Sequence, residues 1–233
     1  SLIRLIFDKK SGELISIFDK VHSKELLSDS TKTIFVDETH CDTWAHDVKE
    51  FNKVVGTFEE GTVSLIEKGP VRATMRSKMQ LFNTTITRDY TIEAESNIIT
   101  VKTVIDFHEQ HKMLKFSIPT NTKNGKAFAK IPFGYIERPS DGSEQHCGDW
   151  IAMFDGKNGL GIANSSKYSF DASENILNLT ILRGSIYADH FGERDEFCEF
   201  MEQGIHKFEY SIFPFESFSK TFSGSSISTK RSV

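Results

Sequence analysis

The chain has 233 residues, and its 33 acidic and 28 basic side chains give a formal net charge of −5 at pH 7. This balance excludes a general nucleic-acid surface, because phosphate binding requires clustered Lys and Arg. No apolar run is long enough to cross a membrane, so no membrane partner is expected. The three cysteines, Cys41, Cys147 and Cys198, are few and widely spaced. Such usage favours a reducing compartment, and we predict a cytoplasmic location.

Short extended segments separated by turn residues fill the N-terminal half. Residues 2–7 and 14–18 flank a polar loop that ends in Gly12, which predicts a hairpin. Further strands are expected over 33–36, 54–57, 62–67, 71–81, 85–93 and 98–107. The chain opens at Ser1 almost inside a strand and has no initiating methionine, so we expect a fragment of a longer polypeptide.

The segment 128–183 has the clearest pattern. Two extended runs, 150–154 and 160–163, are separated by Asp155-Gly-Lys-Asn-Gly159, which has the composition of a hairpin turn. A third run, 176–182, alternates polar with apolar residues and is followed by Arg183. Alternation of this kind buries one face of a sheet. An arginine that ends such a strand lies at a sheet rim, where ligands often bind.

The remaining segments complete an all-β pattern. A charged stretch over 188–202 precedes a last strand over 207–213, and the sequence then becomes rich in Ser and Thr. Many short strands with regular turns and no sustained helical stripe predict a sandwich. We therefore predict one β domain over 1–216, followed by a weakly ordered exit tail over 217–233.

Several motifs, taken in their order and spacing, resemble the C-terminal domain of retaining α-mannosidases of glycoside hydrolase family 38. They are Phe133-Gly-Tyr-Ile-Glu-Arg-Pro139, Trp150, Gly159-Leu-Gly161, Asn164-Ser-Ser-Lys-Tyr168, Leu179-Thr-Ile-Leu-Arg183 and Gly204-Ile-His-Lys-Phe-Glu-Tyr-Ser-Ile-Phe-Pro214. The resemblance implies a large antiparallel super-sandwich similar to galactose mutarotase. It also implies that the chain is part of an enzyme that hydrolyses terminal α-mannosyl residues of mannose-containing oligosaccharides.

The same resemblance assigns the chemistry to another part of the polypeptide. Retaining hydrolysis needs a nucleophilic carboxylate and an acid/base carboxylate about 5 Å apart. In the family these residues and the zinc ligands belong to an N-terminal catalytic domain, and nothing in this chain resembles that domain. We therefore predict no catalytic residue and no cofactor in this chain, with zinc in the missing catalytic domain, which is also the expected partner.

The loop 39–47 contains the densest group of polar side chains. Asp42, Trp44, Asp47 and Phe51 match a C-terminal-domain pattern of the family. The match implies a loop that lines the sugar pocket, with Trp44 stacked on a pyranose ring and the carboxylates accepting from its hydroxyls. Two alternatives remain open. The first is a solvated loop whose Trp44 fills the core, and the second is a metal site built from its His and Asp side chains.

Arg183 also has two interpretations. The resemblance implies that it reaches into the active site, and the alternative is an ordinary surface residue or half of an ion pair. On either interpretation a rim arginine should contribute little to fold stability. A second class of function also remains, a self-standing carbohydrate-binding or aldose-mutarotase-like domain. Mutarotase chemistry would need a histidine facing a glutamate, for which His206 with Glu137 or Glu209 is the candidate.

Overall fold

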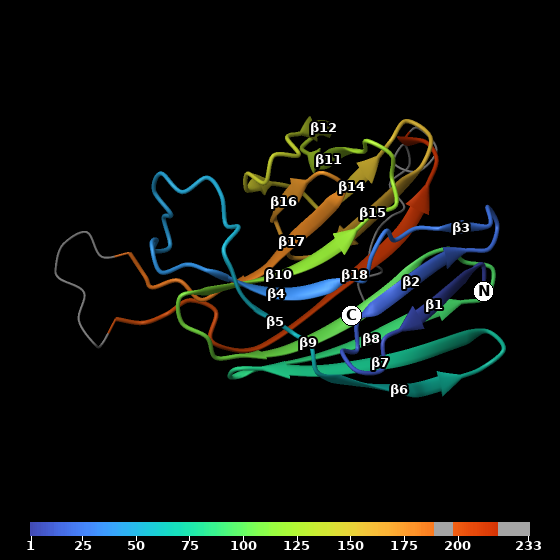
Figure 1. The fold of residues 1–233 in the computed structure, drawn as a ribbon, viewed down its shortest axis with the longest axis horizontal. Helices are drawn as coiled ribbons and strands as arrows, with labels where there is room; N and C mark the ends of the chain where they lie inside the picture. The colour runs from blue at the N-terminus through green and yellow to red at the C-terminus, as the bar shows by residue number, and fades with distance from the viewer. Residues whose placement is uncertain (189–197, 219–233) are drawn as a thin grey trace.

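The computed structural model describes residues 1–188 and 198–218, in which eighteen β-strands form three sheets (Figure 1). Every strand pairing is antiparallel. This confirms the predicted all-β class. Among the described residues no helix is both long and apolar enough to span a bilayer.

Each sheet brings together strands that are distant in sequence. Across the three-stranded sheet the order is β1 (Ile3–Phe7), β2 (Leu14–Asp19) and β3 (Lys24–Glu25). Across the six-stranded sheet it is β13 (Gln145–His146), β16 (Ser169–Ser173), β17 (Ile176–Arg183), β10 (Lys112–Pro119), β4 (Lys32–Asp37) and β5 (Val54–Thr57). Across the nine-stranded sheet it is β12 (Gly134–Arg138), β11 (Lys126–Ile131), β14 (Trp150–Phe154), β15 (Gly159–Asn164), β18 (Gly204–Phe215), β9 (Ile99–Phe107), β8 (Thr84–Glu93), β7 (Arg72–Leu81) and β6 (Gly61–Lys68).

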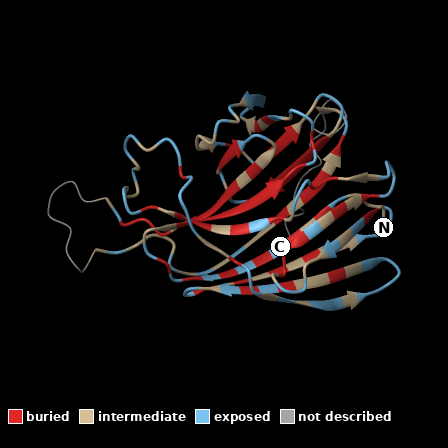
Figure 2. Ribbon diagram, viewed as in Figure 1, coloured by how far each residue is buried: buried red, intermediate tan, exposed pale blue. Residues whose placement is uncertain are grey.

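The main core lies between the two large sheets. On β9 the buried residues alternate with exposed ones, so that Ile99, Val101 and Ile105 face inward. On β10 the inward residues include Leu114 and Phe116, which belong to the same apolar cluster. The buried parts of the strands face one another across the sandwich in Figure 2. On β9, period-two patterning therefore determines which face of the strand is buried.

A second apolar cluster covers the outer face of the nine-stranded sheet. Trp150, Phe213 and Phe215 are buried there. Phe218, just beyond β18, turns back onto the cluster, and its ring stacks on Tyr135 with centroids 4.6 Å apart. Of the predicted exit tail, only residues 217 and 218 are described, so its predicted weak order lies outside the described residues.

The nine-stranded sheet ends at β6, whose side chains are largely exposed. Leu65 is 54% and Ile66 is 49% exposed. The pairing of β6 with β7 is irregular between Leu65 and Glu67, where Ile66 is an extra residue. This is a β-bulge at a sheet edge, and such bulges interrupt the regular ladder of hydrogen-bonding groups.

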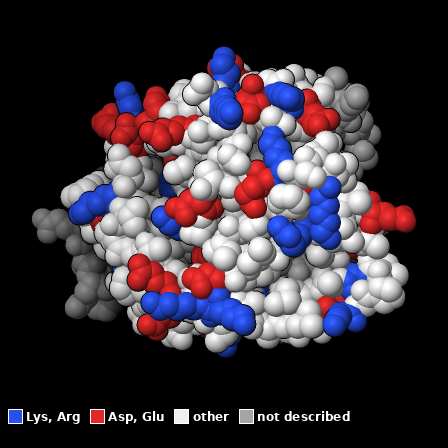
Figure 3. All heavy atoms as spheres, turned by 45° about the vertical axis from the view of Figure 1, so that its right-hand side comes forward, with Lys and Arg blue, Asp and Glu red and all other residues white. Residues whose placement is uncertain are grey.

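The two ends of the sandwich differ. The loop 38–53 and residues 184–188 after β17 lie at one end, and β3 and the N-terminus lie at the other (Figure 1). On the face shown in Figure 3, acidic and basic side chains are interspersed rather than separated. That face therefore lacks the extended basic surface that a nucleic-acid partner would require.

Candidate functional site

The candidate site begins with the direction of Arg183. Strict alternation along β17 would place Arg183 on the same face as Leu177 and Leu179, which are buried in the core. The pairing with β10 shifts by one residue near this end, because Leu114 faces Leu182 whereas Lys115 faces Thr180. The resulting bulge reverses the alternation and directs Arg183 to the outer face of the six-stranded sheet.

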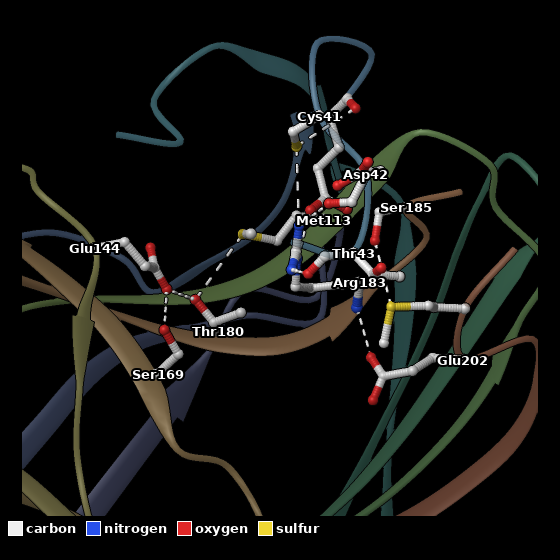
Figure 4. A network of polar contacts seen from close by, with 12 residues as sticks. Cys41, Asp42, Thr43, Met113, Glu144, Ser169, Thr180, Arg183, Ser185 and Glu202 are labelled. Atoms are coloured by element: carbon white, nitrogen blue, oxygen red, sulfur yellow. Dashed lines mark hydrogen bonds and ion pairs between the residues drawn. The ribbon is translucent and has the colours of Figure 1, made fainter. Parts of the chain in front are cut away.

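The Arg183 guanidinium holds the loop 38–47 against the end of β17 (Figure 4). Its Nε donates to Glu38 Oε1 at 2.6 Å, Nη1 to the Thr43 carbonyl at 3.3 Å and Nη2 to the Asp42 carbonyl at 3.2 Å. Nη2 also lies 3.8 Å from Cys41 Sγ. A guanidinium has five N–H donors, and these four contacts leave one hydrogen on Nη1 without a partner among the described residues.

Glu38 is the buried partner of this arginine. Its side chain is 0% exposed, whereas that of Arg183 is 23% exposed. Within the described residues, Glu38 Oε2 has no hydrogen-bond partner. Burial raises the pKa of Glu38 even though the Arg183 charge opposes the shift. Arg183 and Glu38 thus form a largely buried ion pair. Removing either residue would leave the charge of the other without its counter-charge.

The predicted loop residues differ in their relation to Arg183, which contacts the backbone of Asp42 and Thr43. Asp42 Oδ1 accepts from the Trp44 backbone N–H at 2.9 Å, and its backbone bridges to Ile186. Trp44 is 63% exposed, and its ring lies parallel to that of His46 with centroids 5.9 Å apart. Asp47 is exposed at the far end of the loop, where its φ is 62°. The structure therefore brings the loop and Arg183 to one rim.

The exposure of Trp44 excludes one alternative. A tryptophan that filled the core would be buried, so the interpretation of Trp44 as a core residue is wrong. For the metal alternative, the described part of the chain contains no group of three or more His, Cys, Asp or Glu side chains arranged to hold an ion. The tryptophan is instead presented to the surface next to the Arg183 contacts.

A second charged cluster lies on the same outer face. Lys115 is 1% exposed and donates to Glu144 at 2.5 Å and to Asp171. Glu144 also accepts from the hydroxyls of Thr180 and Ser169 (Figure 4). Burial raises the pKa of Asp171, and the Lys115 charge opposes that shift.

This cluster fastens two covering segments to the sheet. The Glu144 N–H donates to the Lys49 carbonyl at 2.9 Å, and Glu50 bridges to Ser143. The Gly142 N–H donates to the Ala172 carbonyl on β16 at 2.8 Å. Sequence reasoning missed this arrangement, because neither Glu38 nor Glu144 lies in a local motif that identifies its distant partner.

The candidate mutarotase pair does not form. His206 Nε2 lies 2.8 Å from the Glu202 carbonyl oxygen. Glu137 is on edge strand β12 and pairs with Lys126 at 3.0 Å. Glu209 is three residues from His206 on β18, so the two side chains are on opposite faces of the sheet. Neither glutamate faces His206 as an acid/base partner would.

Comparison with known proteins identifies relatives of the chain. The family described as "Glycosyl hydrolases family 38 C-terminal domain" matches residues 1–191. Alpha-mannosidase G of Dictyostelium discoideum is 25% identical over 223 residues, which cover 88% of this chain and 20% of that protein. The chain therefore spans about a fifth of the length of this relative.

Solved structures share the fold. A glycosyl hydrolase family 38 protein from Enterococcus faecalis superposes with a TM-score of 0.74 at 18% identity, covering 95% of this chain and 30% of that one. A putative aldose 1-epimerase from Escherichia coli K12 superposes with a TM-score of 0.56 at 8% identity, covering 93% and 97% respectively. At these identities the likeness is one of fold, and it agrees with the expected mutarotase-like super-sandwich.

Proposed function

Because the chain belongs to the family of glycosyl hydrolase family 38 C-terminal domains, we propose that it is the non-catalytic C-terminal domain of a retaining α-mannosidase. In this role it packs on an N-terminal catalytic domain of the same polypeptide and completes the pocket for a mannose-containing oligosaccharide. The nucleophile, the acid/base residue and the zinc ion belong to the catalytic domain in this proposal. The free state of Cys41, Cys147 and Cys198 agrees with a cytoplasmic location.

The observation that carries the proposal is the joining of Arg183 to the loop 38–47. The bulge in β17 directs the guanidinium outward, and its contacts with Asp42 and Thr43 fix the backbone next to Trp44. Two segments that are distant in sequence thereby form one rim with a cation, an exposed aromatic ring and carboxylates. Sugar sites need a small number of polar groups held in place by a rigid scaffold.

Each side chain has a distinct role in this proposal. Trp44 offers its exposed ring to the apolar face of a pyranose, while Asp42 and Asp47 accept hydrogen bonds from sugar hydroxyls. Arg183 supplies its remaining Nη1 hydrogen to a sugar oxygen and keeps the loop in place. The likeness to an aldose 1-epimerase does not add mutarotase chemistry, since a shared fold does not carry a shared function.

The test uses the longer polypeptide that contains both domains. Arg183→Ala should lower kcat/KM for an α-mannoside by the equivalent of about 2–4 kcal/mol, the range for losing a charged hydrogen-bond partner from a desolvated site. Arg76→Ala is the control, because Arg76 on β7 pairs with Asp89 on the neighbouring strand β8, away from this rim. Unchanged kinetics in the Arg183 variant would remove the pocket role.

A second measurement tests the absence of catalytic machinery. The 233-residue chain alone should not hydrolyse an aryl α-mannoside, with or without added zinc, because it has no identifiable pair of catalytic carboxylates. Turnover that accompanies the folded chain through purification and is lost on substitution of one of its acidic residues would contradict this assignment.

A further inference from the structure

A depression with a volume of about 250 Å³ lies beside Arg183, between the loop after β15 and the turn before β18. Its floor is the end of β17, where Ile181 and Leu182 are buried. Tyr168 lines one wall and Glu202 lines the other. Figure 4 shows Ser169 on one side of Arg183 and Glu202 on the other. Ser169 is the neighbour of Tyr168 in the sequence. Arg183 therefore lines this depression and also holds the loop 38–47, which contributes to the proposed sugar pocket.

The wall that carries Tyr168 is firmly held. Asn164 is 2% exposed, and its Oδ1 accepts from the backbone N–H groups of Ser166 at 3.0 Å and Lys167 at 2.6 Å. The Tyr168 carbonyl accepts from the Cys147 N–H at 2.9 Å. Tyr168 itself remains 61% exposed. The loop thus presents an aromatic ring to solvent from a fixed backbone, as a stacking platform requires.

The polar groups of the depression carry opposite charges. Glu202 Oε2 accepts from the Arg183 backbone N–H at 2.6 Å, which fixes that carboxylate at the edge. The Lys167 ammonium lies 5.0 Å from the centroid of the Phe208 ring. Burial lowers the pKa of Lys167, and the Glu202 charge partly offsets this shift. A lining that contains both cationic and anionic side chains favours an uncharged ligand that both donates and accepts hydrogen bonds.

We propose that this depression is a second sugar subsite, which binds the pyranose residue adjacent to the α-mannosyl group that is cleaved. Tyr168 stacks on the apolar face of that ring, Glu202 accepts from its hydroxyls and Lys167 donates to them. This inference rests on the proposed function, since it requires the first pocket to lie beside Arg183. It adds a determinant of substrate length and linkage.

The experiment compares two substrates in the longer polypeptide. Tyr168→Ala should raise KM for at least one of a panel of α-linked mannobioses by about tenfold, the scale of a lost aromatic contact. The same variant should leave the kinetics of α-mannosyl fluoride unchanged, because this substrate has no second ring. Tyr168→Phe should keep near-normal KM values. The control is Tyr187→Ala, an aromatic residue that is 49% exposed but lies outside the depression.

The outcomes separate this inference from the proposed function. If Arg183→Ala impairs both substrates and Tyr168→Ala impairs only the mannobioses, both assignments stand. If Tyr168→Ala leaves every mannobiose unaffected, the subsite is refuted while the Arg183 result still decides the proposed function. An equal loss for the mannobioses and the fluoride would also refute the subsite, because Tyr168 would then act through general packing.

Discussion

Arg183→Ala should destabilise the folded chain more at pH 7 than at pH 5. The substitution removes the cation that faces Glu38, a carboxylate with a side-chain exposure of 0%. It also removes hydrogen bonds to the carbonyls of Asp42 and Thr43. The sequence alone predicts only a small effect for a rim arginine. The buried partner changes that prediction, because an uncompensated carboxylate in the protein interior strongly destabilises the fold.

The magnitude follows from two contributions. The lost backbone contacts are worth about 1 kcal/mol each and do not depend on pH. Without Arg183, Glu38 escapes its burial by taking up a proton, which for an ordinary glutamate requires about 3.5 kcal/mol at pH 7 and about 1 kcal/mol at pH 5. The pKa of Glu38 is already raised in the native chain. The native chain therefore already bears part of this free-energy cost, and the substitution adds only the remainder. We therefore expect a loss of about 3–5 kcal/mol at pH 7 and about 2 kcal/mol at pH 5.

The assay is urea unfolding of a double-mutant cycle at both pH values. Its four members are the native chain, Arg183→Ala, Glu38→Gln and the double variant. When Glu38→Gln is already present, the loss caused by Arg183→Ala should be about 2 kcal/mol and independent of pH, because no carboxylate remains to be neutralised. An Arg183→Ala loss that is equal at pH 5 and pH 7, or absent at both, would refute the argument from the buried ion pair.

Three further results are expected. Lys115→Met should destabilise the chain by about 3–5 kcal/mol in urea unfolding, because it leaves the buried Asp171 and the half-buried Glu144 without their cation; a loss below about 1 kcal/mol would contradict this. The hydrogen bond to Asp19 raises the pKa of His22 above 6.5, so its stabilising contribution is complete below that pH and is lost as pH rises through the folded pKa. The difference in Tm between the native chain and His22→Gln should accordingly shrink between pH 5.5 and pH 8.5. A constant difference would show that protonation of His22 is not coupled to folding. Phe218→Ala should destabilise the chain by about 1–2 kcal/mol by uncovering aromatic rings on the outer face, with increased binding of an apolar dye as the second measurement.

Local patterns predicted the strands well. The turn residues at 155–159 identified the hairpin that joins β14 to β15, and the structure pairs residues 150–154 with residues 159–163. Alternation over 176–182 also identified β17 and its buried face. Strands and turns depend mainly on residues that are close in sequence, so a short segment is enough to predict them.

The site depends on features that no local pattern contains. The bulge at Ile181 reverses the direction of Arg183, and a bulge of this kind has no signature in a run of apolar residues. Arg183 and Glu38 are separated by 145 positions. Lys115 points to the outer face of its strand, and it is buried because Glu144 and the ring of Phe51 cover that face. The family resemblance singled out Arg183 as a candidate site residue, but its buried partner Glu38 could be found only in the structure.

The irregular edge at β6 has a consequence for how the molecule behaves at high concentration. A strand at the end of a sheet can recruit a strand of another molecule and start a growing β-assembly. In β6 the exposed side chains of Leu65 and Ile66 would favour such growth. The extra residue at Ile66 breaks the regular spacing, and the Glu67–Arg72 ion pair sets charge on the same edge. An incoming strand therefore finds no continuous template, and this edge of the sandwich resists aggregation.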